Sequence, residues 1–201
     1  MEEFTLSAKS KGKYSEKGST FSALGVPVSG VVEIKTKLRQ LKEQYSDASH
    51  ICYGYRVKEN DRLDEFAIDA GEPKGSSGIP ILNVIKRKHL VNVVIFVIRY
   101  FGGSKLGIPG LIHAYGRAAE NAIETGNLKK WILYQQISIC YNYDLQKKVD
   151  SLLQQFAINI IKIEFGESIK TDMEVEMEKT DTLAQDLREI SNGAIRIKQI
   201  S

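Results

Sequence analysis

Two glycine-rich segments hold most of the residues whose types and spacing could support chemistry. Residues 71–78 read Gly-Glu-Pro-Lys-Gly-Ser-Ser-Gly, and residues 99–110 begin Arg-Tyr-Phe-Gly-Gly-Ser-Lys. Successive backbone N–H groups in such turns can converge on an anion, and a following helix N-terminus adds a favourable dipole. We therefore expect the two loops to meet in one basic, donor-lined concavity. The anion- or nucleic-acid-binding residues expected there are Lys74, Gly75, Ser76, Ser77, Arg99, Tyr100, Gly102, Gly103, Lys105 and His113.

A purely structural role for these glycines is the alternative. Glycine adopts a positive φ without strain, so both loops could simply be tight connections between elements. Neither loop has the GxxxxGK[ST] spacing of a phosphate-binding loop, and neither contains GxGxxG. Standard nucleotide binding is therefore not expected.

Three polar residues near the loops, His50, Asp69 and Glu72, could support such a site. His50 and Cys52 would face the same side of a strand, which suits a Cys/His nucleophile but equally suits packing. Asp69 and Glu72 could act as paired carboxylates, or they could cap turns and helix starts. We expect no catalytic residue, and three scattered histidines without metal-ligand spacing predict neither a metal site nor a cofactor.

The hydrophobic pattern predicts the elements that would hold these loops. Residues 29–45 have apolar side chains at helical spacing, and residues 48–69 read as a hairpin. A helix should open after the first loop, with Pro80 in its first turn. The nearly unbroken apolar run at 90–98 predicts a strand buried on both faces. A further helix should follow the second loop and end near Gly126.

The last third of the chain has its own order of elements. Strands are expected at 132–141, 158–165, 171–178 and 194–200. Helices are expected at 144–155 and 181–191. The resulting βαββαβ order is that of a ferredoxin-like domain. The sequence thus predicts an α+β protein with two domains, residues 1–130 and residues 131–201.

Charge is distributed unevenly between these two parts. The whole chain carries a net charge of +3, but residues 131–201 hold 8 basic and 11 acidic residues, a net charge of −3. The remainder holds 20 basic and 14 acidic residues, a net charge of +6. This asymmetry indicates that the N-terminal part meets an anionic partner.

Composition excludes several classes of protein. No stretch is long and apolar enough for a membrane-spanning helix, and the acidic N-terminus has no signal segment. Two cysteines, Cys52 and Cys140, cannot build a disulfide framework and are expected to be reduced. We therefore expect a cytoplasmic protein without a membrane partner.

Three segments resemble the signatures of the YigZ/IMPACT-like family. Residues 69–80, DAGEPKGSSGIP, resemble D-D-G-E-P-x-G-T-A-G-x-P, and residues 99–115, RYFGGSKLGIPGLIHAY, resemble R-Y-F-G-G-x-K-L-G-x-G-G-L-x-R-A-Y. Residues 48–56 are similar to A-x-H-x-C-x-A-Y-R. The resemblance covers roughly residues 15–125, and the C-terminal part resembles the second domain of the bacterial YigZ-like branch.

The resemblance implies a fold and a link to translation. It implies an N-terminal β-α domain of the kind shared by a small-subunit ribosomal protein, an elongation-factor domain and small-molecule kinases. Eukaryotic IMPACT relatives regulate translation through a protein partner, whereas the bacterial branch has no assigned activity. Three departures from the signatures weaken a strict catalytic or phosphate-binding role: Ala70 for aspartate, Pro109 for glycine and His113 for arginine.

Three functions remain open from the sequence. The first is a non-catalytic protein that binds RNA, the ribosome or a translation factor through the basic face of the N-terminal domain. The second is an enzyme or sensor for a small phosphorylated or anionic metabolite, and the third is a protein-interaction scaffold. No motif for sequence-specific DNA recognition is present, and the oligomeric state is not predicted.

Overall fold

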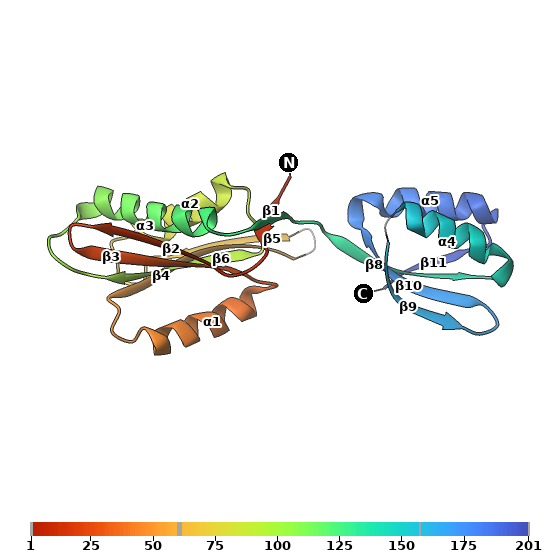
Figure 1. Cartoon of the computed structure of the whole chain (residues 1–201), viewed down its shortest axis with the longest axis horizontal. Helices are drawn as coiled ribbons and strands as arrows, with labels where there is room; N and C mark the ends of the chain where they lie inside the picture. Colours follow the sequence, from red (N-terminus) through yellow and green to blue (C-terminus); the bar gives the residue numbers. More distant parts are fainter. Residues whose placement is uncertain (1, 60–61, 157, 201) are drawn as a thin grey trace. The chain divides into compact units, whose positions relative to one another are not determined.

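The computed structural model describes residues 2–59, 62–156 and 158–200 of the 201-residue chain. It divides the chain into two compact units, Met1–Trp131 and Ile132–Ser201, here called domain one and domain two (Figure 1). Both domains combine helices with antiparallel sheets, so the predicted α+β class is confirmed.

Domain one is built on a five-stranded sheet in which every neighbouring pair is antiparallel. The strand order is β2-β3-β6-β4-β5. Polar and glycine-containing residues before the first predicted helix form a hairpin whose second strand, β3, lies inside the sheet and not at its edge. The strands are β2 (Ser10–Glu16), β3 (Ser19–Pro27), β4 (His50–Glu59), β5 (Arg62–Ile68) and β6 (Val93–Tyr100).

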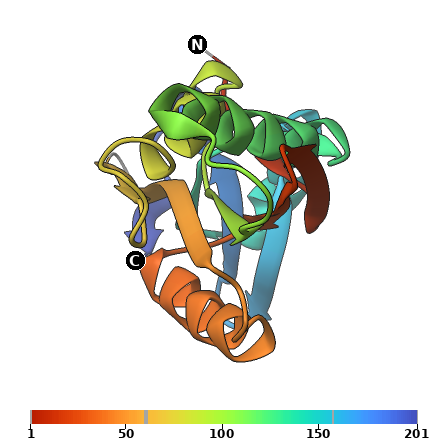
Figure 2. The ribbon, with the colours of Figure 1, turned by 90° about the vertical axis from the view of Figure 1, so that its left-hand side faces the viewer.

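Helices cover both faces of this sheet, as Figure 2 shows. Helix α1 (Val31–Gln44) packs on one face, and α2 (Gly78–Arg87) and α3 (Gly107–Glu124) pack on the other. Their apolar stripes are those expected from the helical spacing of the sequence. Two separate cores result, one on each side of the sheet.

Strand β6 belongs to both cores, which explains its almost continuous apolar sequence. Val93, Ile95 and Val97 enter the core beneath α2 and α3. Val94 and Phe96 enter the core beneath α1. Alternate side chains of a strand point to opposite faces, so a strand covered on both sides must be apolar at every position. The predicted doubly buried strand is therefore confirmed.

Two short strands, which the sequence pattern does not reveal, bring the two ends of domain one together. Strand β1 (Phe4–Leu6) pairs antiparallel with β7 (Leu128–Lys130). Three-residue strands carry too little periodicity to be recognised from sequence.

Domain two has the predicted ferredoxin-like order. Its sheet order is β11-β8-β10-β9, and all neighbours are antiparallel. Helices α4 (Gln146–Gln155) and α5 (Thr180–Ser191) cover one face and share a core with the sheet. The strands are β8 (Tyr134–Tyr141), β9 (Asn159–Phe165), β10 (Ile169–Glu176) and β11 (Arg196–Ile200). Across the described part of the chain, every helix is too short or too polar to cross a membrane.

Candidate functional site

The first glycine loop is closed around the carboxylate of Asp69, the residue that follows β5. Its Oδ2 accepts a hydrogen bond from Gly75 N at 2.7 Å. Its Oδ1 accepts bonds from Ser77 N at 3.1 Å, Ser77 Oγ at 2.8 Å and Gly78 N at 2.9 Å. The loop does form a nest of backbone donors, but its anion is a side chain of the protein itself.

Because the Asp69 carboxylate occupies the nest, the expectation of an open anion site at the first loop is wrong. Ser76 and Ser77 are fully buried, and Ser76 Oγ donates to the carbonyl of Pro73 at 2.6 Å. Burial raises the pKa of Asp69, but the bonds from Gly75, Gly78 and Ser77 outweigh it and hold the pKa below its usual value. The carboxylate is therefore ionised at neutral pH and fills the nest.

A second carboxylate, Glu72, joins the two loops. Its Oε1 accepts hydrogen bonds from Arg99 Nη1 at 2.6 Å and from the Tyr115 hydroxyl at 2.7 Å. The side chains of Glu72 and Arg99 are only 4% and 6% exposed. The two loops thus meet, but their meeting point is a buried ion pair with no net charge.

The guanidinium of Arg99 is held by aromatic rings as well as by this ion pair. Its Cζ lies 5.4 Å from the ring centres of both Phe21 and Phe101. Cation–π contacts of this kind favour arginine over lysine. Arg99 therefore helps to pack the end of the sheet. The expectation that its charge would face solvent and bind an anion is wrong.

Cys52 and His50 face the same side of β4, as predicted, and both bind the turn after β5. Cys52 Sγ donates to the carbonyl of Asp69 at 3.0 Å, and His50 Nδ1 lies 2.9 Å from the carbonyl of Ala70. Burial raises the pKa of the Cys52 thiol to about 11, with further contributions from the nearby carboxylates. A buried thiol with such a pKa is protonated at neutral pH and is a poor nucleophile.

Tyr115 completes the buried network. It is fully buried, and its ring packs edge-on against Phe21 at 5.0 Å between centroids. Burial, together with the neighbouring Cys52 and Glu72, raises the pKa of its hydroxyl. The hydroxyl therefore acts as a hydrogen-bond donor to Glu72.

In the second loop, close backbone packing accounts for the paired glycines. A Cβ on Gly102 would lie 2.2 Å from the carbonyl oxygen of Gly18, and one on Gly103 would lie 2.3 Å from that of Lys17. Gly103 also has a φ of +64°. The N–H of Gly102 donates to Ser19 Oγ at 3.3 Å, so the first residue of β3 uses this donor. These positions need glycine for packing.

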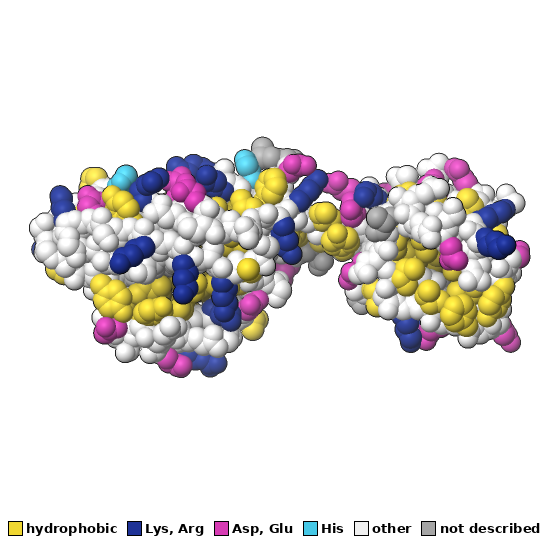
Figure 3. All heavy atoms as spheres, viewed as in Figure 1, with side chains coloured by type: hydrophobic (Ala, Val, Ile, Leu, Met, Phe, Trp, Pro, Cys, Tyr) yellow, Lys and Arg dark blue, Asp and Glu magenta, His cyan; other side chains and the backbone are white. Residues whose placement is uncertain are grey.

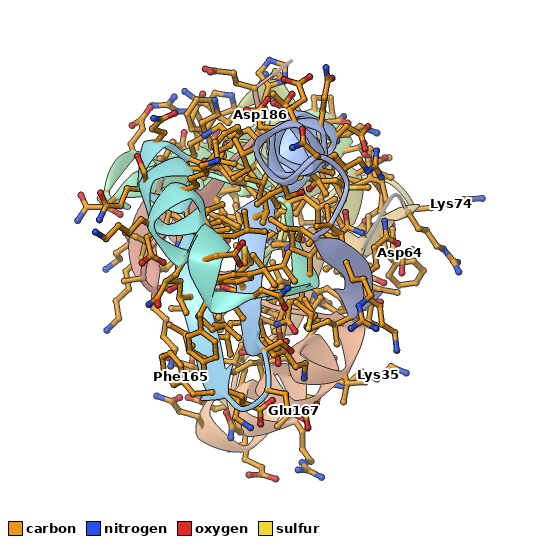
Figure 4. The ribbon with its side chains drawn as sticks, turned by 90° about the vertical axis from the view of Figure 1, so that its right-hand side faces the viewer. Lys35, Asp64, Lys74, Phe165, Glu167 and Asp186 are labelled. Atoms are coloured by element: carbon orange, nitrogen blue, oxygen red, sulfur yellow. The ribbon has the colours of Figure 1, made fainter. Side chains whose placement is uncertain are left out.

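The remaining predicted residues lie at the surface and are not gathered into one pocket. Lys74, Lys105 and His113 are exposed, and Figure 4 shows Lys74 extending outward. The ring of His113 packs edge-on against Tyr14 at 5.7 Å. The Tyr100 hydroxyl donates a hydrogen bond to Asp47 Oδ1 at 2.9 Å.

A row of lysines along the edge strand β2 was not expected from the sequence. Gly12 faces α3, because a Cβ there would lie 2.3 Å from the backbone nitrogen of Ala122. Lys11 and Lys13, its neighbours, therefore point to the opposite face, which is the face that α1 covers. The period-two spacing of Lys9, Lys11 and Lys13 was the available signal.

Helix α1 carries further cations on this face of the sheet. Figure 4 shows Lys35 extending on the same side as Asp64 of β5, which is the sheet edge opposite β2. A shallow groove of about 380 Å³ on this helix is lined by Lys35, Leu38, Arg39, Lys42 and Glu43. The space-filling view shows Lys and Arg side chains over β2, above a hydrophobic strip that separates them from α1 (Figure 3). Within the described ranges, no three His, Cys, Asp or Glu side chains are grouped so as to hold a metal ion.

Comparison with known families follows the same division of the chain. Residues 17–123 match the Impact N-terminal domain, and residues 140–194 match a domain of unknown function, DUF1949. The IMPACT family member YvyE of Bacillus subtilis is 31% identical over 86% of this chain and 79% of its own length. The chain belongs to the IMPACT family. The resemblance predicted from the loop signatures is thereby confirmed.

Other IMPACT family members and solved structures are more distant. YigZ of Escherichia coli is 23% identical over 92% of this chain and 91% of its own length. The protein IMPACT homolog of Saccharomyces cerevisiae is 25% identical over 55% of this chain and 44% of its own length. A crystal structure of a hypothetical protein shares the IMPACT fold with a TM-score of 0.69 at 22% identity, covering 100% of this chain and 98% of that one.

Proposed function

We propose that this IMPACT family member is a non-catalytic binding protein that attaches to RNA of the translation machinery through a cationic face of domain one. The observation that carries the proposal is a set of lysines and arginines without a carboxylate partner among the described residues. They follow strand β2 with its turn and helix α1: Lys9, Lys11, Lys13, Lys17, Lys35, Lys37, Arg39 and Lys42.

Several other cations of domain one already have a carboxylate partner. Arg56 and Lys86 share Glu65, and Lys58 pairs with Glu3 at 2.8 Å. Cations without partners attract a polyanion because each phosphate contact releases condensed counterions. Lys74 and Lys105, both exposed on the glycine loops, extend the proposed surface. The link to translation rests on the family resemblance.

Salt dependence of RNA binding tests this proposal. The double substitution Lys11→Ala/Lys13→Ala should lower the slope of log affinity against log salt by about 1.4 to 1.8, since each lost phosphate contact removes about 0.7 to 0.9. The measurement is a binding titration with ribosomal RNA at several salt concentrations. Base-specific contacts are not needed for this effect.

The matched control is Lys147→Ala/Lys148→Ala on α4, because these two lysines are also close in sequence and exposed but belong to acidic domain two. The control should leave both affinity and slope unchanged. Equal effects of the two double substitutions, or no binding at low salt, would refute the proposed RNA surface.

Protein docking is a second candidate, favoured by exposed apolar residues in the second loop and at the start of α3. Phe101, Ile108 and Ile112 are 53%, 53% and 43% exposed. Aromatic and aliphatic side chains in such positions commonly anchor protein partners. Affinity capture from lysate with and without nuclease separates the two functions. A protein that stays bound after nuclease treatment and is lost with Phe101→Ala would favour docking over RNA binding.

A further inference from the structure

Strand β9 is an uncovered edge of the sheet in domain two. Among the described residues, the order β11-β8-β10-β9 leaves one side of β9 without a strand neighbour, and all seven residues of β9 are exposed. Free N–H and C=O groups along such an edge favour pairing with another strand. Four of its exposed side chains are large and apolar: Ile160, Ile161, Ile163 and Phe165.

Pairing with β10 fixes the direction of the β9 side chains. Ile163 and Phe165 lie opposite β10 residues that are buried beneath the helices, so both belong to the helix-covered side of the sheet. Lys162 and Glu164 lie opposite charged residues of β10, on the open side. These two carry opposite charges and already form an ion pair at 2.7 Å.

We propose that β9 is the seam of a homodimer in which the β9 strands of two copies pair antiparallel about a two-fold axis at Ile163. In this register Lys162 of each copy lies opposite Glu164 of the other, and the two Ile163 side chains face each other. The register shift against β10 leaves Ile161 out of the regular ladder, so the paired segment is Lys162 to Glu164. Opposite charges and apolar pairs in facing positions stabilise an antiparallel pair. A two-fold interface uses the same surface on both subunits, so the favourable charge pair occurs twice.

The charge pattern selects this register and this partner. An axis at Lys162 would place two lysines face to face, and an axis at Glu164 would place two glutamates face to face. Like charges directly opposite destabilise a strand pair. The sequence of β9 is therefore complementary to its own copy in one register.

The helix side of β9 offers the same partner additional apolar surface. A groove of about 290 Å³ between α4 and β9 is lined by the apolar Leu153, Ile158 and Ile160 and by the polar Asp150 and Gln154. Phe165 stands at the end of β9 next to the turn toward β10 (Figure 4). A second strand beside β9 would shield these side chains from water, which is the main driving force of association.

Analytical ultracentrifugation of the full chain over a concentration series tests the homodimer. We expect a monomer–dimer equilibrium, and amide hydrogen exchange of β9 that slows as the dimer forms. Lys162→Glu or Glu164→Lys alone should weaken the dimer about tenfold or more, because two favourable pairs become repulsive. The double charge swap Lys162→Glu/Glu164→Lys should restore it.

A matched control and a cross-link complete the design. Lys198→Glu changes an exposed lysine on β11, at the opposite edge of the same sheet, and should leave the dimer intact. Ile163→Cys places a cysteine on the proposed axis and should give a disulfide-linked dimer on mild oxidation, whereas Lys198→Cys should not. Circular dichroism verifies that each variant is folded.

Several results would overturn the proposed dimer. A monomer at every accessible concentration contradicts it directly. A dimer that neither single charge reversal weakens, or that the double swap does not restore, lies elsewhere on the surface. Protection of β9 that requires a different protein would assign the edge to another partner. None of these outcomes depends on RNA binding by domain one.

Discussion

At the residue scale, the end of the domain-one sheet depends on one carboxylate. Glu72 receives hydrogen bonds from both Arg99 and Tyr115 in a place that solvent scarcely reaches. A buried cation whose partner is removed keeps its desolvation cost and loses its attraction. The geometry therefore makes Glu72 a stabilising residue, although its position in a loop signature suggested a functional one.

We expect Glu72→Gln to lower the free energy of unfolding by about 3 to 5 kcal/mol, since it leaves Arg99 buried without a counter-charge. Urea denaturation of the full chain measures this loss. The control is Glu65→Gln, which removes a carboxylate shared by Arg56 and Lys86 nearer the surface. The control should cost about 1 kcal/mol or less. Equal losses at the two sites would contradict the buried-pair account.

At the element scale, the second glycine loop is a packing joint between β6 and the turn of the β2–β3 hairpin. The backbones of Gly102 and Gly18 are too close for any side chain to fit between them. Contacts between Ser19 and Gly102 hold the hairpin, whose strand β2 carries the proposed cationic row, to the end of β6. A change in this joint should therefore act through stability and not through charge.

We expect Gly102→Ala to destabilise domain one by about 1 to 3 kcal/mol, because the new methyl group overlaps backbone atoms that cannot move freely. Gly116→Ala is the matched control, since this glycine lies inside α3 with nothing within 4 Å of the added Cβ. It should instead stabilise the helix by up to about 1 kcal/mol. Thermal and urea unfolding distinguish the two. Stability changes of opposite sign in the two variants would support the packing role of Gly102. A Gly102→Ala variant with unchanged stability would refute it.

At the scale of the whole molecule, the two domains differ in charge and in core. Domain one has a core on each side of its sheet, and domain two has a single core of its own. The net charge of +6 on residues 1–130 and −3 on residues 131–201 directs any polyanion toward domain one. The open face of the domain-two sheet carries carboxylates such as Asp172 and Glu174 beside its cations, which suits RNA poorly.

The cationic face should extend from β2 onto α1 if both contact the same polyanion. Lys35→Ala/Arg39→Ala should then reduce the salt slope of RNA binding by about 1.4 to 1.8, as expected for two lost phosphate contacts. Titrations over a salt series provide the measurement. If the salt slope of this variant equals that of the unsubstituted protein while the slope of Lys11→Ala/Lys13→Ala is reduced, the RNA contact is confined to β2.

Much of the fold follows from local patterns in the chain. The hydrophobic pattern predicts the doubly buried strand β6, the amphipathic helices α1 and α3, and the strand–helix order of domain two. Local patterns do not predict the contents of the candidate site. Asp69 fills the nest made by Gly75, Ser77 and Gly78, and no spacing rule distinguishes an internal carboxylate from an external phosphate as the bound anion.

The sequence by itself determined the family, the α+β class and the order of the longer elements, and it predicted that the two glycine loops meet. Tertiary structure decided what lies at that meeting point, because Glu72 and Arg99 are 27 residues apart and their pairing depends on how the sheet brings them together. It also decided which cations remain free and which edge remains open. Periodicity reports the face a residue occupies, whereas only the folded chain reports which charges have found a partner.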